Sequence, residues 1–143
     1  MKYISLGIPS SYEEITKKTM PRIIESYKDN SSFGIFAAFL KHVDEFIGWF
    51  QFKIDEEIKD AIEIGWRLKK QYWGNGYATE VAIALSDKGV EMGKKIVARS
   101  MIENIASIRV MEKAGLKLKN EFWGDYQPHS GHPDVLYIRS PNR

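Results

Sequence analysis

The chain contains no cysteine, which excludes a disulfide framework, a thiolate nucleophile and a cysteine-based zinc site. No window approaches the roughly 18 consecutive apolar residues that a membrane span needs, and the N-terminus lacks the apolar run of a signal peptide. We therefore expect a cytoplasmic protein without a membrane partner. The net charge is only +2, and the basic residues are scattered, so a nucleic-acid partner is not expected.

The rest of the composition is that of an ordinary folded protein. Hydrophobic residues make up 43% of the 143 positions and charged residues 28%, which lies within the range of soluble globular domains. No internal repeat, low-complexity tract or linker divides the chain. We therefore expect one domain over residues 1–143, with a core of its own.

Hydrophobic periodicity predicts alternating helical and extended segments. Ser10 and Glu13 have the spacing of a capping box, and Pro21 predicts two short helices meeting near residues 19–21. Further helices are expected over 78–92 and 106–114, and strands over 33–40, 46–52, 61–68, 96–101, 116–123 and 134–139. The first two strands should form a hairpin. This order predicts an α+β fold with a central mixed, mostly antiparallel sheet flanked by helices, rather than a doubly wound sheet.

The most informative segment is Gln-Tyr-Trp-Gly-Asn-Gly-Tyr-Ala-Thr-Glu at 71–80, between a predicted strand and the clearest helix. Glycines at this point let the backbone take positive φ angles and approach a ligand closely. The free N–H groups and the dipole at a helix N-terminus attract phosphate. The pattern therefore fits a diphosphate-bearing ligand, although an ordinary tight turn has the same appearance.

This segment resembles the Gln/Arg-x-x-Gly-x-Gly/Ala acetyl-CoA motif of the GNAT superfamily of N-acetyltransferases, with Gln71, Gly74 and Gly76 in the motif positions. A second stretch, from Asn104 through Ser107 to Lys-Ala-Gly-Leu at 113–116, is similar to the family's Asn-x-x-Ser…Lys-Ala-Gly-Phe segment. The resemblance covers about residues 33–138. Within the superfamily, the chain resembles the ribosomal-protein N-terminal acetyltransferase-like branch most, for example in the sequence Glu-Ile-Gly-Trp at 63–66. Family members usually begin with a further strand, which we expect to be absent or replaced in this chain.

The resemblance implies the GNAT fold and direct transfer of the acetyl group of acetyl-CoA to a primary amine, either a protein N-terminus or a small molecule. It implies Glu63 as general base and Ser107 as general acid, and no metal. A homodimer is possible. Cofactor-binding residues implied in the same way are Leu68, Lys69, Lys70, Gln71, Gly74, Asn75, Gly76, Tyr77, Ala78, Asn104 and Ser107.

Several alternatives remain open from the residues alone. Glu63 could be a salt-bridged strand carboxylate, Asp125, Tyr126 and His129 are competing bases, and Asn104 and Ser107 could simply cap a helix.

Other function classes are weighed on the same residues. A dinucleotide-binding domain is disfavoured because Thr79 stands at the third glycine position, and no basic, aromatic run indicates RNA binding. A non-catalytic acyl-CoA-binding or sensing module is the remaining rival. Acidic residues over 56–60 and at Asp125 could attract a cationic amine, but the acceptor is left open among protein N-termini, amino acids, polyamines and antibiotics.

Overall fold

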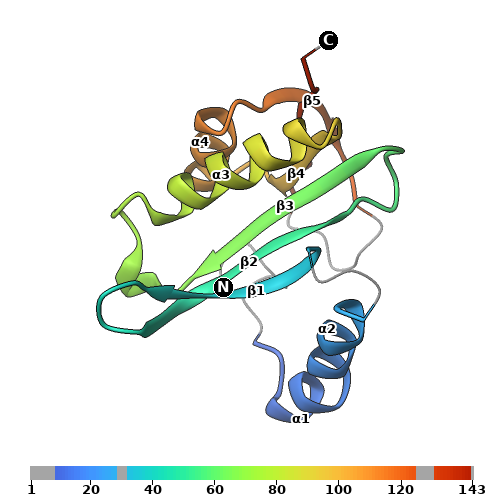
Figure 1. The fold of residues 1–143 in the computed structure, drawn as a ribbon. Helices are drawn as coiled ribbons and strands as arrows, with labels where there is room; N and C mark the ends of the chain where they lie inside the picture. The colour runs from blue at the N-terminus through green and yellow to red at the C-terminus, as the bar shows by residue number, and fades with distance from the viewer. Residues whose placement is uncertain (1–8, 29–31, 125–130, 143) are drawn as a thin grey trace.

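The computed structural model describes residues 9–28, 32–124 and 131–142 of the chain. Its secondary structure alternates in the order expected from the sequence (Figure 1). The elements are α1 (Tyr12–Glu14), a π-helical segment η2 (Ile15–Thr19), α2 (Met20–Ser26), β1 (Gly34–Leu40), β2 (Glu45–Ile54), β3 (Ala61–Leu68), the 3-10 turn η3 (Lys70–Tyr72), α3 (Tyr77–Glu91), β4 (Lys95–Met101), α4 (Ile105–Lys113), β5 (Lys117–Phe122) and β6 (Asp134–Arg139).

The six strands form one open mixed sheet in the order β1-β2-β3-β4-β6-β5. All neighbours pair antiparallel except β3 and β4, which run parallel. The parallel pair is joined by α3, because parallel strands need a crossover connection that returns the chain to the same end of the sheet. The expected α+β class, with a mostly antiparallel sheet and an initial hairpin, is confirmed.

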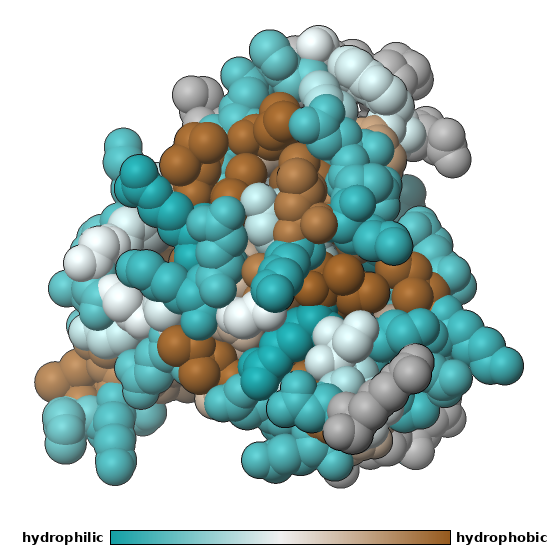
Figure 2. All heavy atoms as spheres, turned by 90° about the horizontal axis from the view of Figure 1, so that it is seen from above, coloured by the Kyte–Doolittle hydropathy of each residue, from teal (hydrophilic) through white to brown (hydrophobic). Residues whose placement is uncertain are grey.

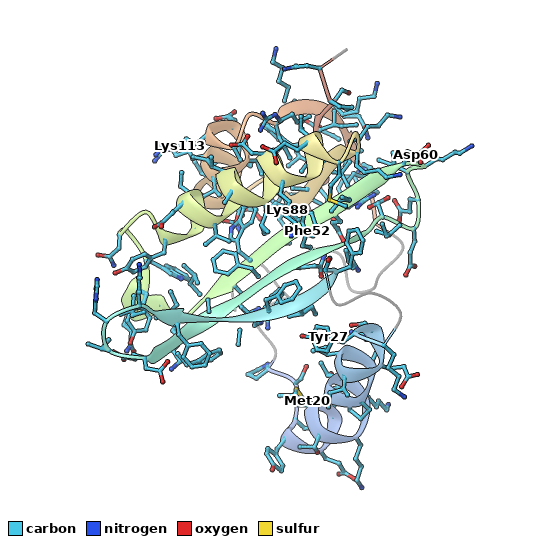
Figure 3. All side chains as sticks on the ribbon, in the orientation of Figure 1. Met20, Tyr27, Phe52, Asp60, Lys88 and Lys113 are labelled. Atoms are coloured by element: carbon cyan, nitrogen blue, oxygen red, sulfur yellow. The ribbon has the colours of Figure 1, made fainter. Side chains whose placement is uncertain are left out.

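Helices α3 and α4 lie together over one face of the sheet and bury its apolar side chains (Figure 1). The core beneath them includes Phe52, Ile62, Ile64 and Met111, all at most 2% exposed. Lys88 of α3 extends over the ring of Phe52, with its Nζ atom 5.7 Å from the ring centroid (Figure 3). Burial of this face is the main source of stability, because apolar area removed from water is the dominant favourable term in folding.

The helices cover the sheet with their apolar sides and turn polar residues outward. Seen from the side of α3 and α4, the surface is largely hydrophilic and its apolar side chains appear as separate patches (Figure 2). No helix within the described ranges is both long and apolar enough to cross a membrane.

The N-terminal helical segment differs from the sequence-based expectation. Helix α1 is capped by Ser11, whose Oγ accepts from the N–H of Glu14 at 3.1 Å, so the predicted Ser10 cap is wrong by one residue. The helical run from Tyr12 to Ser26 changes from the π-helical η2 to α2 between Thr19 and Met20, where two helices were expected to meet, and Pro21 lies in the first turn of α2. Pro21 has no N–H to donate, and the run accommodates it by widening into a π-helical segment just before it, where Met20 N–H bonds to Ile15 O.

This helical segment lies away from α3 and α4, as Figure 1 shows, and contacts the sheet at β1. The Tyr27 ring lies against Gly34 and its hydroxyl donates to the carbonyl of Ile35. None of the α1, η2 and α2 side chains is buried. The expectation that the family's first strand is absent or replaced concerns the chain before these helices, and residues 1–8 there lie outside the described residues.

Candidate active site

Strands β3 and β4 pair over only part of their lengths. Their ladder joins Ala61 to Lys95, Ile62 to Ile96 and Glu63 to Val97, and then stops. Strand β3 continues to Leu68 and β4 continues to Met101. Among the described residues, the edge of β3 that faces β4 therefore has no sheet partner beyond Glu63, while its other edge remains paired with β2. Unpaired strand backbone in the middle of a sheet is a ready-made site for an extended ligand with amide groups.

A cavity of about 210 Å³ occupies this split. Its walls come from both separated strands, from β2 and from the start of α4. Residues on these walls include Trp49 and Gln51 of β2, Glu63, Gly65 and Trp66 of β3, Arg99, Ser100 and Met101 of β4, and Asn104 and Ser107 next to and within α4. The split between the strands thus brings the two expected catalytic residues, Glu63 and Ser107, to one cavity.

The glycine turn leads from the end of β3 into helix α3. Gly74 and Gly76 have φ angles of 78° and 80°, a left-handed conformation that favours glycine over other residues. A Cβ atom added at either position would meet nothing within 4 Å, so the glycines are required by the backbone conformation and border open space. Gly76 is the N-cap of α3 and supplies no side-chain acceptor. The first-turn N–H groups of Tyr77 and Ala78 are therefore available to an anion.

Side chains of the same motif hold the turn in place. The Asn75 amide donates to the carbonyls of Tyr72 and Trp73 at 3.1 and 3.3 Å. The Trp73 indole donates to the Leu68 carbonyl at 2.9 Å. A hydrogen bond from the Tyr72 hydroxyl to Glu45 raises the pKa of Tyr72 above its usual value, and Gln71 in turn donates to this hydroxyl at 3.2 Å.

Several backbone groups around 68–70 already have protein partners. Lys69 N–H donates to Ile47 O at 2.8 Å, and the carbonyls of Lys69 and Lys70 accept from Tyr72 and Trp73 at 3.0 and 3.1 Å. The Leu68 carbonyl accepts from the indole described above. The unpaired backbone beside β4 therefore lies mainly upstream of these residues, in the stretch of β3 that follows Glu63.

Glu63 is held firmly at the cavity wall. Its carboxylate accepts from Gln51 Nε2 at 2.8 Å and from Arg99 Nη1 at 3.1 Å, and Lys53 Nζ lies 3.4 Å away. The side chain is 19% exposed. The structure thus places the expected base in the cavity, and it also shows the salt bridge that was the alternative interpretation of this residue.

Arg99 joins Glu63 to the turn between β2 and β3. Its guanidinium lies 2.5 Å from Asp55 and 3.0 Å from Glu57. Burial alone would raise the pKa of Asp55, but hydrogen bonds from Arg99 and from the N–H groups of Ile58 and Glu57 outweigh it and hold this pKa below the usual value. These contacts neutralise much of the acidic stretch over 55–60, and Asp60 pairs with Lys94 at 3.1 Å.

Asn104 and Ser107 meet at the first turn of α4. Asn104 is the N-cap, and its Oδ1 accepts from Ser107 N–H at 3.3 Å. The capping interpretation is therefore correct for Asn104, whose amide NH₂ remains the part that could donate to a ligand. Both residues also line the cavity, so capping places the Ser107 side chain beside the split strands.

Sequence reasoning missed Gln51 and Arg99 as members of this site. The position of Arg99 within the apolar run of β4 could have indicated an ion pair, because buried arginine is almost always paired. The competing bases Asp125, Tyr126 and His129 lie outside the described residues. Within the described residues, no group of three or more His, Asp or Glu side chains is arranged to hold a metal.

Comparison with known proteins agrees with this geometry. Residues 1–117 match the family model described as acetyltransferase (GNAT) domain. An N-acetyltransferase of uncharacterised function from Bacillus subtilis, YnaD, is 38% identical over 76 residues, which are 45% of this chain and 45% of that protein. The chain spans about half the length of the curated relatives it matches, with shares of 36–60%.

Solved structures share the fold over nearly the whole chain. A GNAT-family acetyltransferase from Bacillus anthracis superposes with a TM-score of 0.75 at 28% identity, covering 98% of this chain and 80% of the other. RimL, a ribosomal L7/L12 α-N-protein acetyltransferase solved with coenzyme A, has a TM-score of 0.74 at 21% identity, covering 92% and 74%. The similarity to RimL supports the fold only. With its family model matching most of the sequence, this chain belongs to the GNAT acetyltransferase family.

Proposed function

We propose that this chain is an N-acetyltransferase that transfers the acetyl group of acetyl-CoA to a primary amine. The observation that carries the proposal is the split between β3 and β4, with Glu63 and Ser107 on the walls of one cavity. Family membership supports the choice of donor.

The residues present fit acetyl-CoA in two places. The open space at Gly74 and Gly76 and the uncapped first turn of α3 suit the diphosphate, because backbone N–H groups at a helix N-terminus favour anions. The unpaired edge of β3 after Glu63 suits the amide groups of the pantetheine arm. Together these features would direct the thioester into the cavity.

The chemistry then needs two groups that handle protons. The acceptor nitrogen attacks the thioester carbonyl, the carbon–sulfur bond breaks, and the amine loses a proton while the thiolate gains one. Glu63 is the proposed acceptor of the amine proton, and its three neighbouring donors fix its orientation. Ser107 is the proposed donor to the thiolate, on the α4 side of the cavity. Holding both substrates in one cavity contributes by proximity and orientation.

Calorimetric titration with acetyl-CoA, followed by assay of free thiol over a panel of amines and peptides, tests the proposal. Binding followed by thiol release with at least one amine is the expected result. Binding without release from any amine would favour the acyl-CoA-sensing alternative. A failure to bind would refute the assignment of the split and the glycine turn to acetyl-CoA.

A further inference from the structure

Arg67 is a cation at the edge of the proposed site. It lies on β3 four residues after Glu63, so the two side chains leave the strand on the same face. Trp49 of β2 is its direct partner across the ladder. The guanidinium carbon lies 5.4 Å from the centroid of the Trp49 ring, which is cation–π range. This stacking holds the guanidinium in one place.

Within the part of the chain that the structure describes, one polar atom of the Arg67 side chain is buried without an acceptor. Its Nε atom is buried and has no hydrogen-bond partner, and over residues 9–28, 32–124 and 131–142 no carboxylate pairs with its guanidinium. Burial lowers the pKa of Arg67. By contrast, Arg99 and Arg139 each meet an aspartate at 2.5 and 2.7 Å. A buried donor without an acceptor is destabilising, which distinguishes Arg67 from these two arginines.

The surroundings of Arg67 connect it to the cavity. Trp49, on which it stacks, and Gly65, two positions earlier on the same strand face, both line the cavity. Gly65 carries no side chain, and between Glu63 and Arg67 this face of β3 is bordered by the side chain of its cross-strand partner Gln51. Glu63 and Arg67 are about 13 Å apart along the strand, at 3.3 Å per residue.

We propose that Arg67 binds a carboxylate of the amine acceptor, so that the acceptor is a carboxylate-bearing amine such as a short peptide. The amine would lie toward Glu63 and Ser107, and the carboxylate would lie about 7–13 Å away, the distance spanned by two to four strand residues. An extended tripeptide has this separation between its amino and carboxyl groups. The inference rests on the proposed acetyl transfer and narrows its substrate class.

The charges around the cavity favour this class over a polyamine. Glu63, Asp55 and Asp60 are already paired with Arg99 or Lys94, so they do not offer free negative charge to a second ammonium group. Arg67 adds repulsion for such a group. A planar guanidinium fixed on an aromatic ring is well suited to a carboxylate, which it can bind with two parallel hydrogen bonds.

Arg67 is less suited to the phosphates of the donor. The adjacent residue Trp66 packs against the core under α3, and side chains alternate along a strand. Arg67 therefore lies on the face of β3 directed away from α3, whose N-terminus is the proposed diphosphate site. Separate measurement of donor and acceptor affinity distinguishes the two anions.

The test is calorimetric titration of trialanine and trialanine amide, with and without coenzyme A, which has no acetyl group to transfer. Wild-type protein should bind the carboxylate form about tenfold or more tightly than the amide, since a hydrogen bond between charged groups is at least of that strength. Arg67→Gln should remove this preference without changing affinity for coenzyme A, and Arg67→Lys should keep part of it. Lys119→Gln, at an exposed position of β5, is the matched loss of one positive charge and should leave the preference intact.

Equal affinity of the wild type for the two peptides, or no binding of trialanine, would overturn the inference even if the variants fail to fold. A preference that survives in Arg67→Gln would also overturn it. A tenfold loss of coenzyme A affinity in that variant would assign Arg67 to the donor instead. Failure of the proposed acetyl transfer would appear separately, as absence of thiol release from acetyl-CoA with every amine.

Discussion

Substitution of Gly76 by alanine separates backbone strain from ligand binding, because the same helix offers a control. Gly76 precedes α3 with φ of 80°, and Gly93 follows it with φ of 74°. An added Cβ would meet nothing within 4 Å at either position. The two glycines therefore share their conformation and their freedom from steric contact, but lie at opposite ends of the helix.

Both substitutions should destabilise the protein to a similar extent. A left-handed conformation costs a residue with a Cβ about 1–2 kcal/mol. For a chain of this size that corresponds to a fall in melting temperature of about 2–8 °C. Thermal unfolding of Gly76→Ala and Gly93→Ala measures this common effect.

Only Gly76→Ala should weaken acetyl-CoA binding. Its methyl group enters the open space next to the first-turn N–H groups of α3, where it would hinder the approach of the diphosphate. Loss of one or two hydrogen bonds to a charged group, at about 1.5–3 kcal/mol each, should reduce affinity at least about tenfold. Calorimetric titration of both variants with acetyl-CoA measures this difference in affinity. Equal affinities in the two variants would refute the placement of the diphosphate at this turn.

Two further substitutions test the cavity, and a third tests the ion pair between Arg99 and Asp55 next to it. Glu63→Gln keeps the shape of the side chain and should lower kcat about 10²–10⁴-fold with little change in acetyl-CoA affinity, the range for loss of a general base; an unchanged kcat would remove Glu63 from the chemistry. Ser107→Ala should lower kcat less than Glu63→Gln does, because a thiolate leaves readily, and steady-state kinetics on both variants makes the comparison. Asp55→Asn should lower the free energy of unfolding, measured by denaturant titration, by about 3 kcal/mol. This is the lower end of the range for a broken buried ion pair, because Glu57 and Glu63 still face Arg99. Since the pKa of folded Asp55 lies below its usual 3.8, its stabilisation is present above about pH 4 and is lost as the pH falls through the folded-state value; wild-type stability should decline there more steeply than that of Asp55→Asn.

Local patterns predicted much of the fold. The strands Ala61–Leu68 and Asp134–Arg139 have the predicted bounds, because runs of β-branched and aromatic residues there are bordered by polar turns. The helix after the glycine turn was also predicted, since its apolar residues repeat with helical spacing. The N-cap was placed at Ser10 instead of Ser11 because adjacent serines offer the same cap chemistry. The π-helical segment depends on a shifted hydrogen-bond ladder that periodicity does not show.

The pairings at the site depend on contacts between distant parts of the chain. Glu63 meets Arg99 because β3 and β4 run side by side up to Glu63 and Val97, a register that neither strand's own sequence specifies. The unpaired state of Arg67 is likewise a property of its surroundings, since an arginine in a strand is usually matched by a carboxylate somewhere in the fold. The family resemblance thus made Glu63 and Ser107 candidates, whereas their neighbours required the structure.

The most direct test of the proposed activity is to incubate the wild-type protein with acetyl-CoA and a panel of amines and to measure acetylated amine by mass spectrometry alongside free thiol. The account predicts one acetylated amine for each thiol released, with release dependent on the amine. Acetyl-CoA that binds but yields no acetylated product with any amine would contradict the central claim that the split between β3 and β4 is an acetyl-transfer site.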